Sequence, residues 1–263
     1  MQRFLVSLKM EFLSTVRNRT ATFFNLVFPM LLFIFFGYIF NSPNGGLSVT
    51  GTASVANGGV KEALWLLPGI IAISIATNGL FNSIPMIILR ETGVFRRIQA
   101  TPMPVAQYLM ARIVIQLVIV VIQVALAILV GVIFFQVHPE GSGWYLDVAF
   151  ILVGAIVFIT LGQFIAAVSP RQETAQIISQ IINLPLVFLS NIYLPFLILP
   201  DVVQKIGRAL PGFMMVDVLR PAMILGSVTQ ANSTLNSPLV DLGGLALYFI
   251  VALIITARFF RWS

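Results

Sequence analysis

Residues 113–136 read IVIQLVIVVIQVALAILVGVIFFQ, a stretch without a single charged side chain. A helix needs about 20 consecutive, mainly apolar residues to cross the hydrocarbon core of a bilayer. This stretch is long enough, and its three glutamines are its only strongly polar residues. It therefore predicts a transmembrane helix.

Five other stretches are apolar in the same way. Together they predict six transmembrane helices, at residues 20–40, 64–89, 107–135, 148–168, 174–199 and 239–257. The composition agrees, since 59% of the 263 residues are hydrophobic and only 9% are charged, whereas roughly a quarter of the residues in a soluble domain are charged. We predict an all-α membrane protein, with residues 1–263 forming one transmembrane domain.

The residue counts exclude several kinds of site. Cysteine is absent, and His138 is the only histidine. A structural zinc site, a disulfide framework, an iron–sulfur cluster and a thiol nucleophile are all excluded by these counts, and we expect no bound metal. The formal net charge of +6 is interpreted as a signal of membrane orientation, not of nucleic-acid binding.

The basic residues are unevenly divided between the two sides of the predicted bundle. Eleven of the 15 lie in the termini and in the connections after the second and fourth spans: Arg3, Lys9, Arg17, Arg19, Arg90, Arg96, Arg97, Arg112, Arg171, Arg258 and Arg261. Cytoplasmic segments of membrane proteins are enriched in lysine and arginine. The sequence therefore predicts a multi-pass protein of the cell membrane with both termini in the cytoplasm.

Two regions outside the spans have helical patterns of their own. Residues 1–19 combine apolar positions at helical spacing with four cations, which favours an amphipathic helix in the membrane interface over a frayed basic leader. The connection between the fifth and sixth spans contains two short apolar segments, at 201–210 and 213–225. These are interpreted either as extracellular re-entrant helices that form an external gate, or as helices lying flat on the surface.

Uncharged polar residues recur at helical spacing within the spans. The set comprises Gln176, Gln180, Asn183 and Ser190 in the fifth span and Asn78 and Asn82 in the second. They could line a substrate pathway, or they could hydrogen-bond between helices. Phe28, in an aromatic-rich first span, is a further pathway candidate that could stack on an amphipathic substrate. Since the middle of every span lacks charge, a proton-driven pump is disfavoured.

The most specific segment is RETGVFRRIQATPMP, residues 90–104. It resembles the signature connection of the ABC type-2 exporter permease family, and the matching positions are Glu91, Gly93, Ile98, Thr101 and Pro102. The family's second mark follows the fifth span and frames the predicted external gate. Here its positions are Leu199, Pro200, Pro211 and the pair Leu219-Arg220.

This resemblance implies the membrane half of an ATP-driven exporter. The connection at 90–104 would form a coupling helix in a groove of a separate ABC ATPase subunit. Glu91, Arg96 and Arg97 would contact that subunit, although the arginines could instead anchor the helix to phospholipid headgroups. A second permease subunit, identical or different, would complete the transporter, and ATP and Mg would bind to the ATPase subunits.

The lysines support an external source of energy. A phosphate-binding P-loop ends in Gly-Lys-Ser/Thr, whereas Lys9, Lys61 and Lys205 are followed by methionine, glutamate and isoleucine. The chain is therefore not expected to be an enzyme. We predict a permease that exports a hydrophobic or amphipathic substrate, either a drug-like molecule or a lipid, by alternating access. The alternative is an ion-coupled secondary transporter or channel that works without an ATPase.

Overall fold

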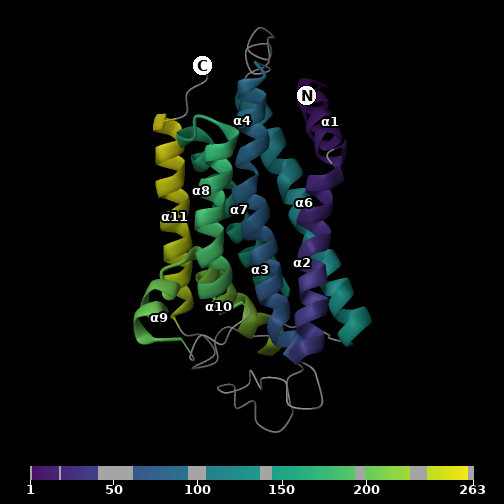
Figure 1. Ribbon diagram of the computed structural model, residues 1–263, viewed down its shortest axis with the longest axis vertical. Coiled ribbons are helices and arrows are strands. Elements are labelled where there is room, and N and C mark those ends of the chain that lie inside the picture. Colours follow the sequence, from purple (N-terminus) through teal and green to yellow (C-terminus); the bar gives the residue numbers. More distant parts are fainter. Residues whose placement is uncertain are drawn as a thin grey trace.

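The computed structural model describes residues 2–17, 19–40, 62–93, 105–136, 144–192, 199–225 and 236–259. Every secondary-structure element in these ranges is a helix, and the all-α prediction is confirmed for them. Figure 1 shows that the longer helices run side by side along one axis. The helices are α1 (Gln2–Arg17), α2 (Arg19–Phe40), α3 (Glu62–Phe81), α4 (Ser83–Glu91), α6 (Val105–Phe135), α7 (Trp144–Val168), α8 (Gln172–Leu189), α9 (Asp201–Arg208), α10 (Pro211–Leu225) and α11 (Pro238–Phe259).

Each predicted span corresponds to a helix or helix pair, with two differences. The second span is divided into α3 and α4 at Asn82, because Pro85 lacks the N–H that would bond to Phe81 and its ring crowds that carbonyl. The fifth span ends at Leu189, ten residues before the predicted end. Asn191 has a φ of 56°, and a left-handed residue of this kind commonly terminates a helix.

Four of the helical segments are long and apolar enough to cross a membrane by length and composition. They are Leu64–Glu91, Met110–Phe135, Asp147–Val168 and Pro238–Thr256. Within the described residues α2 contributes the shorter apolar segment Phe23–Ile39, and α8 has 18 residues. Six crossings therefore remain a prediction.

The segment formed by α3 and α4 is the centre of the bundle. In its most apolar window 78% of the residues are buried, compared with 22% for α6 and 17% for α11. The contact between α3 and α7 is close enough to need glycine, since a Cβ atom on Gly162 would overlap the carbonyl oxygen of Gly79. Small residues of this kind allow the backbones of membrane helices to approach one another.

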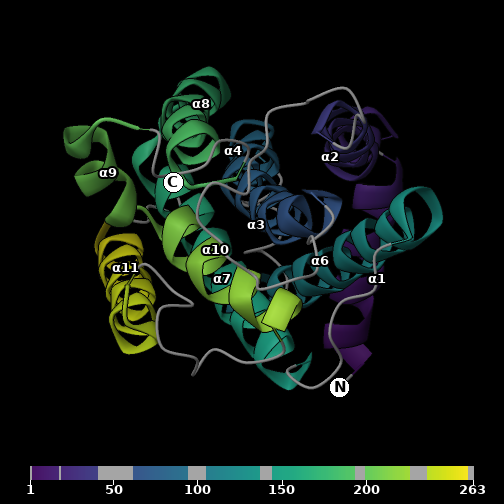
Figure 2. The same cartoon turned by 90° about the horizontal axis from the view of Figure 1, so that it is seen from below.

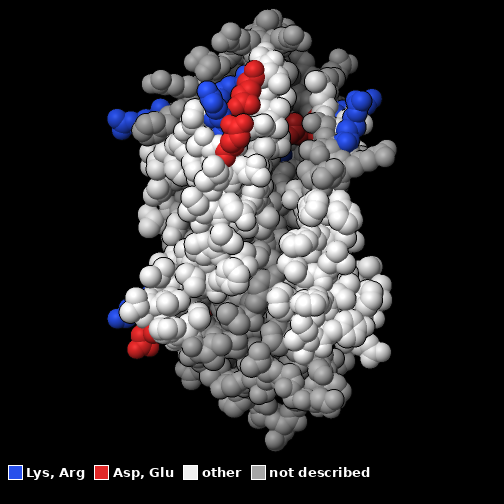
Figure 3. Space-filling view, viewed as in Figure 1, with Lys and Arg blue, Asp and Glu red and all other residues white. Residues whose placement is uncertain are grey.

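The two ends of the bundle differ. The start of α1, the end of α4 and the end of α11 lie at one end, called here the terminal end, whereas α9 and α10 lie at the opposite end (Figure 1). Seen along the bundle, α1 extends sideways next to α6, and α10 crosses the opposite end beneath α3 and α7 (Figure 2). On the face in Figure 3 most of the charged side chains lie near the terminal end and a few near α9, with a wide uncharged zone between them.

The short helices α9 and α10 occupy the predicted gate region. In α9, Val202 is 70% exposed and Ile206 is 54% exposed. The first nine residues of α10, by contrast, are all buried, packed against α3, α7 and α11. Insertion of these helices into the outer leaflet remains a prediction.

Candidate functional site

The break between α3 and α4 leaves backbone carbonyls available to neighbouring helices. The carbonyl oxygen of Leu80 accepts hydrogen bonds from the hydroxyl of Ser83, at 2.9 Å, and from the hydroxyl of Ser179 on α8, at 3.3 Å. The carbonyl oxygen of Asn82 accepts one from Arg112 on α6, at 2.7 Å. The break therefore joins α6 and α8 to the central helix through polar contacts.

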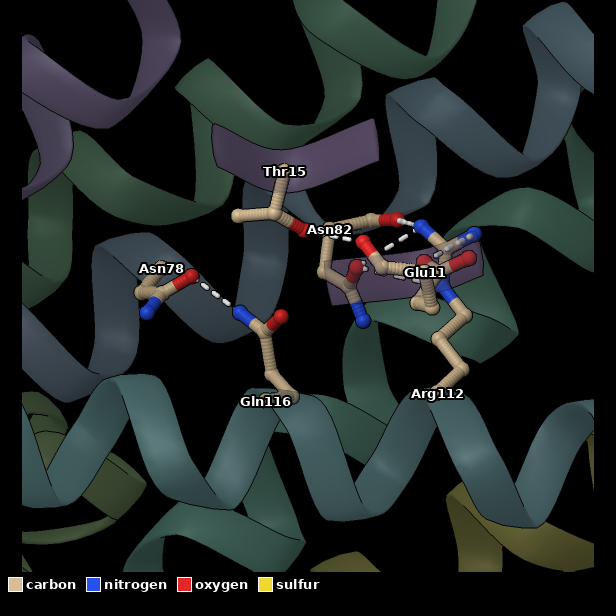
Figure 4. A network of polar contacts seen from close by, with 6 residues as sticks. All are labelled: Glu11, Thr15, Asn78, Asn82, Arg112 and Gln116. Atoms are coloured by element: carbon tan, nitrogen blue, oxygen red, sulfur yellow. Dashed lines mark hydrogen bonds and ion pairs between the residues drawn. The ribbon is translucent and has the colours of Figure 1, made fainter. Parts of the chain in front are cut away.

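Arg112 is the most deeply buried cation near this break, with only 2% of its surface exposed. Besides the Asn82 carbonyl, its guanidinium donates to the side-chain oxygen of Asn82, from Nε at 3.2 Å and from Nη2 at 2.7 Å. Its Nη1 lies 3.5 Å from a carboxylate oxygen of Glu11 on α1. Figure 4 shows how these side chains, from α1, α6 and the break between α3 and α4, converge. A buried charge with one partner removed is costly, so this ion pair is expected to hold α1 against the bundle.

A chain of side-chain amides continues from this site toward α2. Asn78 accepts a hydrogen bond from Gln116 (Figure 4) and donates one to Gln123 at 3.1 Å. Gln123 in turn donates to the backbone carbonyl of Asn25 on α2, at 3.0 Å. Asn78 and Asn82, both proposed as pathway residues, thus bond to α6 in this structure.

The polar residues of α8 are divided between two faces. Asn183 is buried and accepts a hydrogen bond from Thr77 of α3 at 3.2 Å, and Ser190 is fully buried against Gly212 of α10. Gln176 and Gln180 are exposed. The four residues predicted to form one stripe therefore divide into two that face the bundle and two that face outward.

The aromatic candidate Phe28 lies on the outer face of α2, where 48% of its surface is exposed. Its ring centroid is 6.3 Å from that of Phe24, which is also exposed. These rings face away from the polar residues of α3 and α6. The structure does not bring Phe28 together with the other pathway candidates.

At the terminal end, α4 stops where the sequence changes from apolar to basic. Gly93 has a φ of 71°, and a Cβ atom built on it would meet nothing within 4 Å. Glycine is therefore favoured here by backbone conformation, because residues with a side chain rarely adopt a left-handed φ. A glycine of this kind ends many helices. Glu91 is exposed beside it. The other predicted coupling residues, Arg96, Arg97, Ile98, Thr101 and Pro102, lie outside the described residues.

At the opposite end, Arg220 of α10 connects three helices. Its guanidinium lies 3.8 Å from the centroid of the Trp65 ring, and Nε donates to the carbonyl of Trp65 at 3.3 Å. Its Nη2 donates to the carbonyl of Asn191, just beyond α8. Cation–π stacking and charge-assisted hydrogen bonds are strong when shielded from water, so Arg220 fixes this end of the bundle.

The remaining gate candidates surround α9. The carbonyl of Leu199 accepts a hydrogen bond from Gln204 at 2.8 Å, Pro200 precedes the helix, and Pro211 begins α10. Pro211 is buried, whereas Pro200 is exposed. Arg220 is therefore the predicted gate residue with the most extensive contacts described here.

Two functional candidates escaped the sequence analysis. Glu11 is the only acidic residue before Glu62, and that isolation within an apolar, basic helix could have marked it as the partner of a cation. Arg90 was counted only as a positive charge, although its side chain reaches the turn between α7 and α8. Neither contact can be derived from spacing, because each joins segments about 80 or more residues apart.

The sequence is similar to known transport proteins over most of its length. The model of the ABC-2 type transporter family matches residues 2–224. The Bacillus subtilis (strain 168) protein named "Putative transport permease YvfS" is 27% identical over 203 residues, which cover 77% of this chain and 78% of that relative. The matched family region includes α1, the break at Asn82 and the α4 end.

Proposed function

The chain belongs to the ABC-2 type transporter family, and from this premise we propose that it exports a hydrophobic or amphipathic substrate from the cytoplasm. As a member of this family it is a membrane subunit of an ABC transporter. ATP and Mg would bind to a separate ATPase subunit, whose closure would move the permease between inward-open and outward-open states. This is alternating access driven by differential stability of the two states.

The observation that most directly supports this proposal is the combination of the family match with an uncharged bundle surface. The charges at the centre of the described site, Arg112 and Glu11, are paired with one another, and the surface in Figure 3 has a wide uncharged zone. A substrate that meets aromatic and amide side chains instead of charges is expected to be apolar or amphipathic. Drug-like molecules and lipids are the proposed classes.

The exposed face of α8 supports a second permease subunit. Gln176 and Gln180 lie there beside Ile177 and Ile181, which are 60% and 63% exposed. A glutamine side chain facing lipid would leave amide groups without hydrogen-bond partners, which costs free energy in a bilayer. A second copy or a homologous subunit over this face would remove that cost, and the two pairs of glutamines would then border a shared substrate pathway.

The orientation is also a proposal. The helix ends that border the cation-rich segments lie at the terminal end (Figure 1). The positive-inside rule assigns such an end to the cytoplasm. The end of α4 would then face the ATPase, while α9, α10 and Arg220 would form the external gate.

The proposal is tested by isolating the chain from membranes of the source cell under mild detergent. We expect co-isolation of a subunit containing a P-loop, ATP hydrolysis by the isolated complex, and a native mass that fits two permeases and two ATPases. Proteoliposomes of the permease alone provide the decisive contrast. If they transport a substrate when only an ion gradient is imposed, the chain is a secondary transporter instead.

A further inference from the structure

Two adjacent residues of opposite charge, Arg90 and Glu91, end helix α4 at the terminal end of the bundle. They precede the connection that the family resemblance assigns to ATPase contact. In the structure both side chains are turned toward the short link between α7 and α8, residues 169–171. Each side chain contacts a helix end whose partial charge is opposite to its own.

Arg90 binds the carboxyl end of α7. Its Nη1 donates to the carbonyl of Ala166 at 3.4 Å, and its Nη2 donates to the carbonyls of Ser169 and Pro170, the latter at 3.2 Å. The last four carbonyls of a helix lack intrahelical partners and carry a partial negative charge. The Arg90 guanidinium therefore caps the carboxyl end of α7, although Arg90 belongs to a different helix.

Glu91 binds the amino end of α8. Its carboxylate oxygen Oε1 accepts a hydrogen bond from the backbone N–H of Gln172, the first residue of α8, at 3.1 Å. The residue at the N-cap position, Arg171, provides no side-chain cap. An acidic side chain is a favourable partner for the partial positive charge of this helix end.

The position of Glu91 in its own helix strengthens this interpretation. A carboxylate in the last turn of α4 is unfavourable for the dipole of α4. The nearby cation Arg90 offsets part of that cost, but its guanidinium is directed to three carbonyls of the α7–α8 link. The favourable interaction of Glu91 is thus with α8, not with α4.

We infer that Arg90 and Glu91 are positioning residues that clamp the end of α4 to the α7–α8 link, so that movement of α4 is transmitted to α8. This inference rests on the proposed function, and it assigns Glu91 to an intramolecular contact instead of the ATPase interface. Further along, α8 is joined to the central segment through Ser83 and Ser179, 3.4 Å apart, and through Thr77 and Asn183. The clamp and these bonds make α4 and α8 move as one unit that includes Gln176 and Gln180.

The first part of the test is amide hydrogen exchange of the purified permease. Glu91→Ala leaves the Gln172 N–H without its acceptor, and we expect exchange in the first turn of α8 to be about fivefold faster, which is the typical effect of losing a helix cap. Glu91→Gln keeps an acceptor oxygen without the charge and should give a smaller increase. Glu173→Ala removes an exposed acid from the first turn of α8 itself; it should lose only the favourable interaction with the helix dipole and give a smaller increase than Glu91→Ala.

The second part uses the complex with its ATPase subunit, after Gln176→Cys has been introduced into this cysteine-free chain. In the otherwise unaltered complex, ATP should change the rate at which a thiol reagent labels that position. We expect Glu91→Ala to retain the ATPase subunit and its hydrolysis within about twofold but to abolish the ATP-dependent change in labelling. Glu91→Gln should keep most of it.

The inference is overturned if Glu91→Ala leaves exchange at α8 unchanged while the ATPase subunit is lost, since Glu91 would then be an interface residue. It is also overturned if ATP-dependent labelling persists in Glu91→Ala. Failure of the proposed function gives a different result, because the unaltered chain would then co-isolate no ATPase although the exchange effect of Glu91→Ala would remain.

Discussion

Replacing Arg112 with alanine is expected to lower the free energy of unfolding by about 4 kcal/mol, because the substitution removes a buried cation and leaves the largely shielded Glu11 without the cation that it is paired with. The same change removes three hydrogen bonds to Asn82. The measurement is a denaturation curve of the purified protein in detergent. Protease cleavage after Arg17 should also become faster, since α1 loses its ion pair with α6.

Two variants define what this result means. Arg171→Ala removes an exposed arginine from the same end of the bundle and should change stability by no more than about 0.5 kcal/mol. Arg112→Lys keeps the charge but lacks the planar fork that reaches both oxygens of Asn82, and it should lie between alanine and the unaltered protein. Equal stability of Arg112→Ala and the unaltered protein would contradict the assigned role of this site.

Replacing Gly162 with alanine should be nearly as damaging. The new Cβ atom would overlap the Gly79 carbonyl oxygen, and this clash is with backbone, which cannot rotate away. The helices α3 and α7 must separate, at a cost of about 3 kcal/mol, the upper end of the usual range for overpacking. Thermal unfolding in detergent would detect this as a lower midpoint.

Gly243 is the matched control, because a Cβ atom there would meet nothing within 4 Å. In the helix α11, Gly243→Ala should stabilise the protein by up to about 1 kcal/mol through helix propensity. The same chemical change is therefore predicted to have opposite signs at the two positions. If both substitutions leave the stability unchanged, α3 and α7 are not in close contact at Gly162.

The sequence predicted the helices better than their interruptions. Apolar runs locate α6, α7 and α11 to within a few residues, because a bilayer demands a minimum length of uncharged helix. Pro85, a proline within an apolar run, is the sequence signal for the break at Asn82. The end of α8 at Leu189 was missed, because it depends on the backbone conformation of Asn191, which hydropathy does not register.

The sequence identified some polar residues of the site but not the helices that they contact. Helical spacing correctly grouped Asn78 with Asn82 on one face of the second span, yet it could not say which helix they meet. Their partners, Gln116 and Arg112, depend on how α3 packs against α6. The contacts of Arg90 and Glu91 with the α7–α8 link are likewise set by tertiary structure, because the partners are separated by about 80 residues.

Contact with a cytoplasmic ATPase requires the end of α4 to lie on the cytoplasmic side of the membrane. The chain has no cysteine, so single cysteines can be placed at Thr92, which follows α4, and at Lys205 in α9. Both residues are exposed, and α4 and α9 lie at opposite ends of the bundle (Figure 1). Each cysteine can be labelled with a membrane-impermeant maleimide. We predict that intact cells label the Lys205 position but not the Thr92 position, and that inverted vesicles give the reverse. Labelling of Thr92→Cys in intact cells would place the proposed motor and its contact on opposite sides of the membrane, and the account would be contradicted.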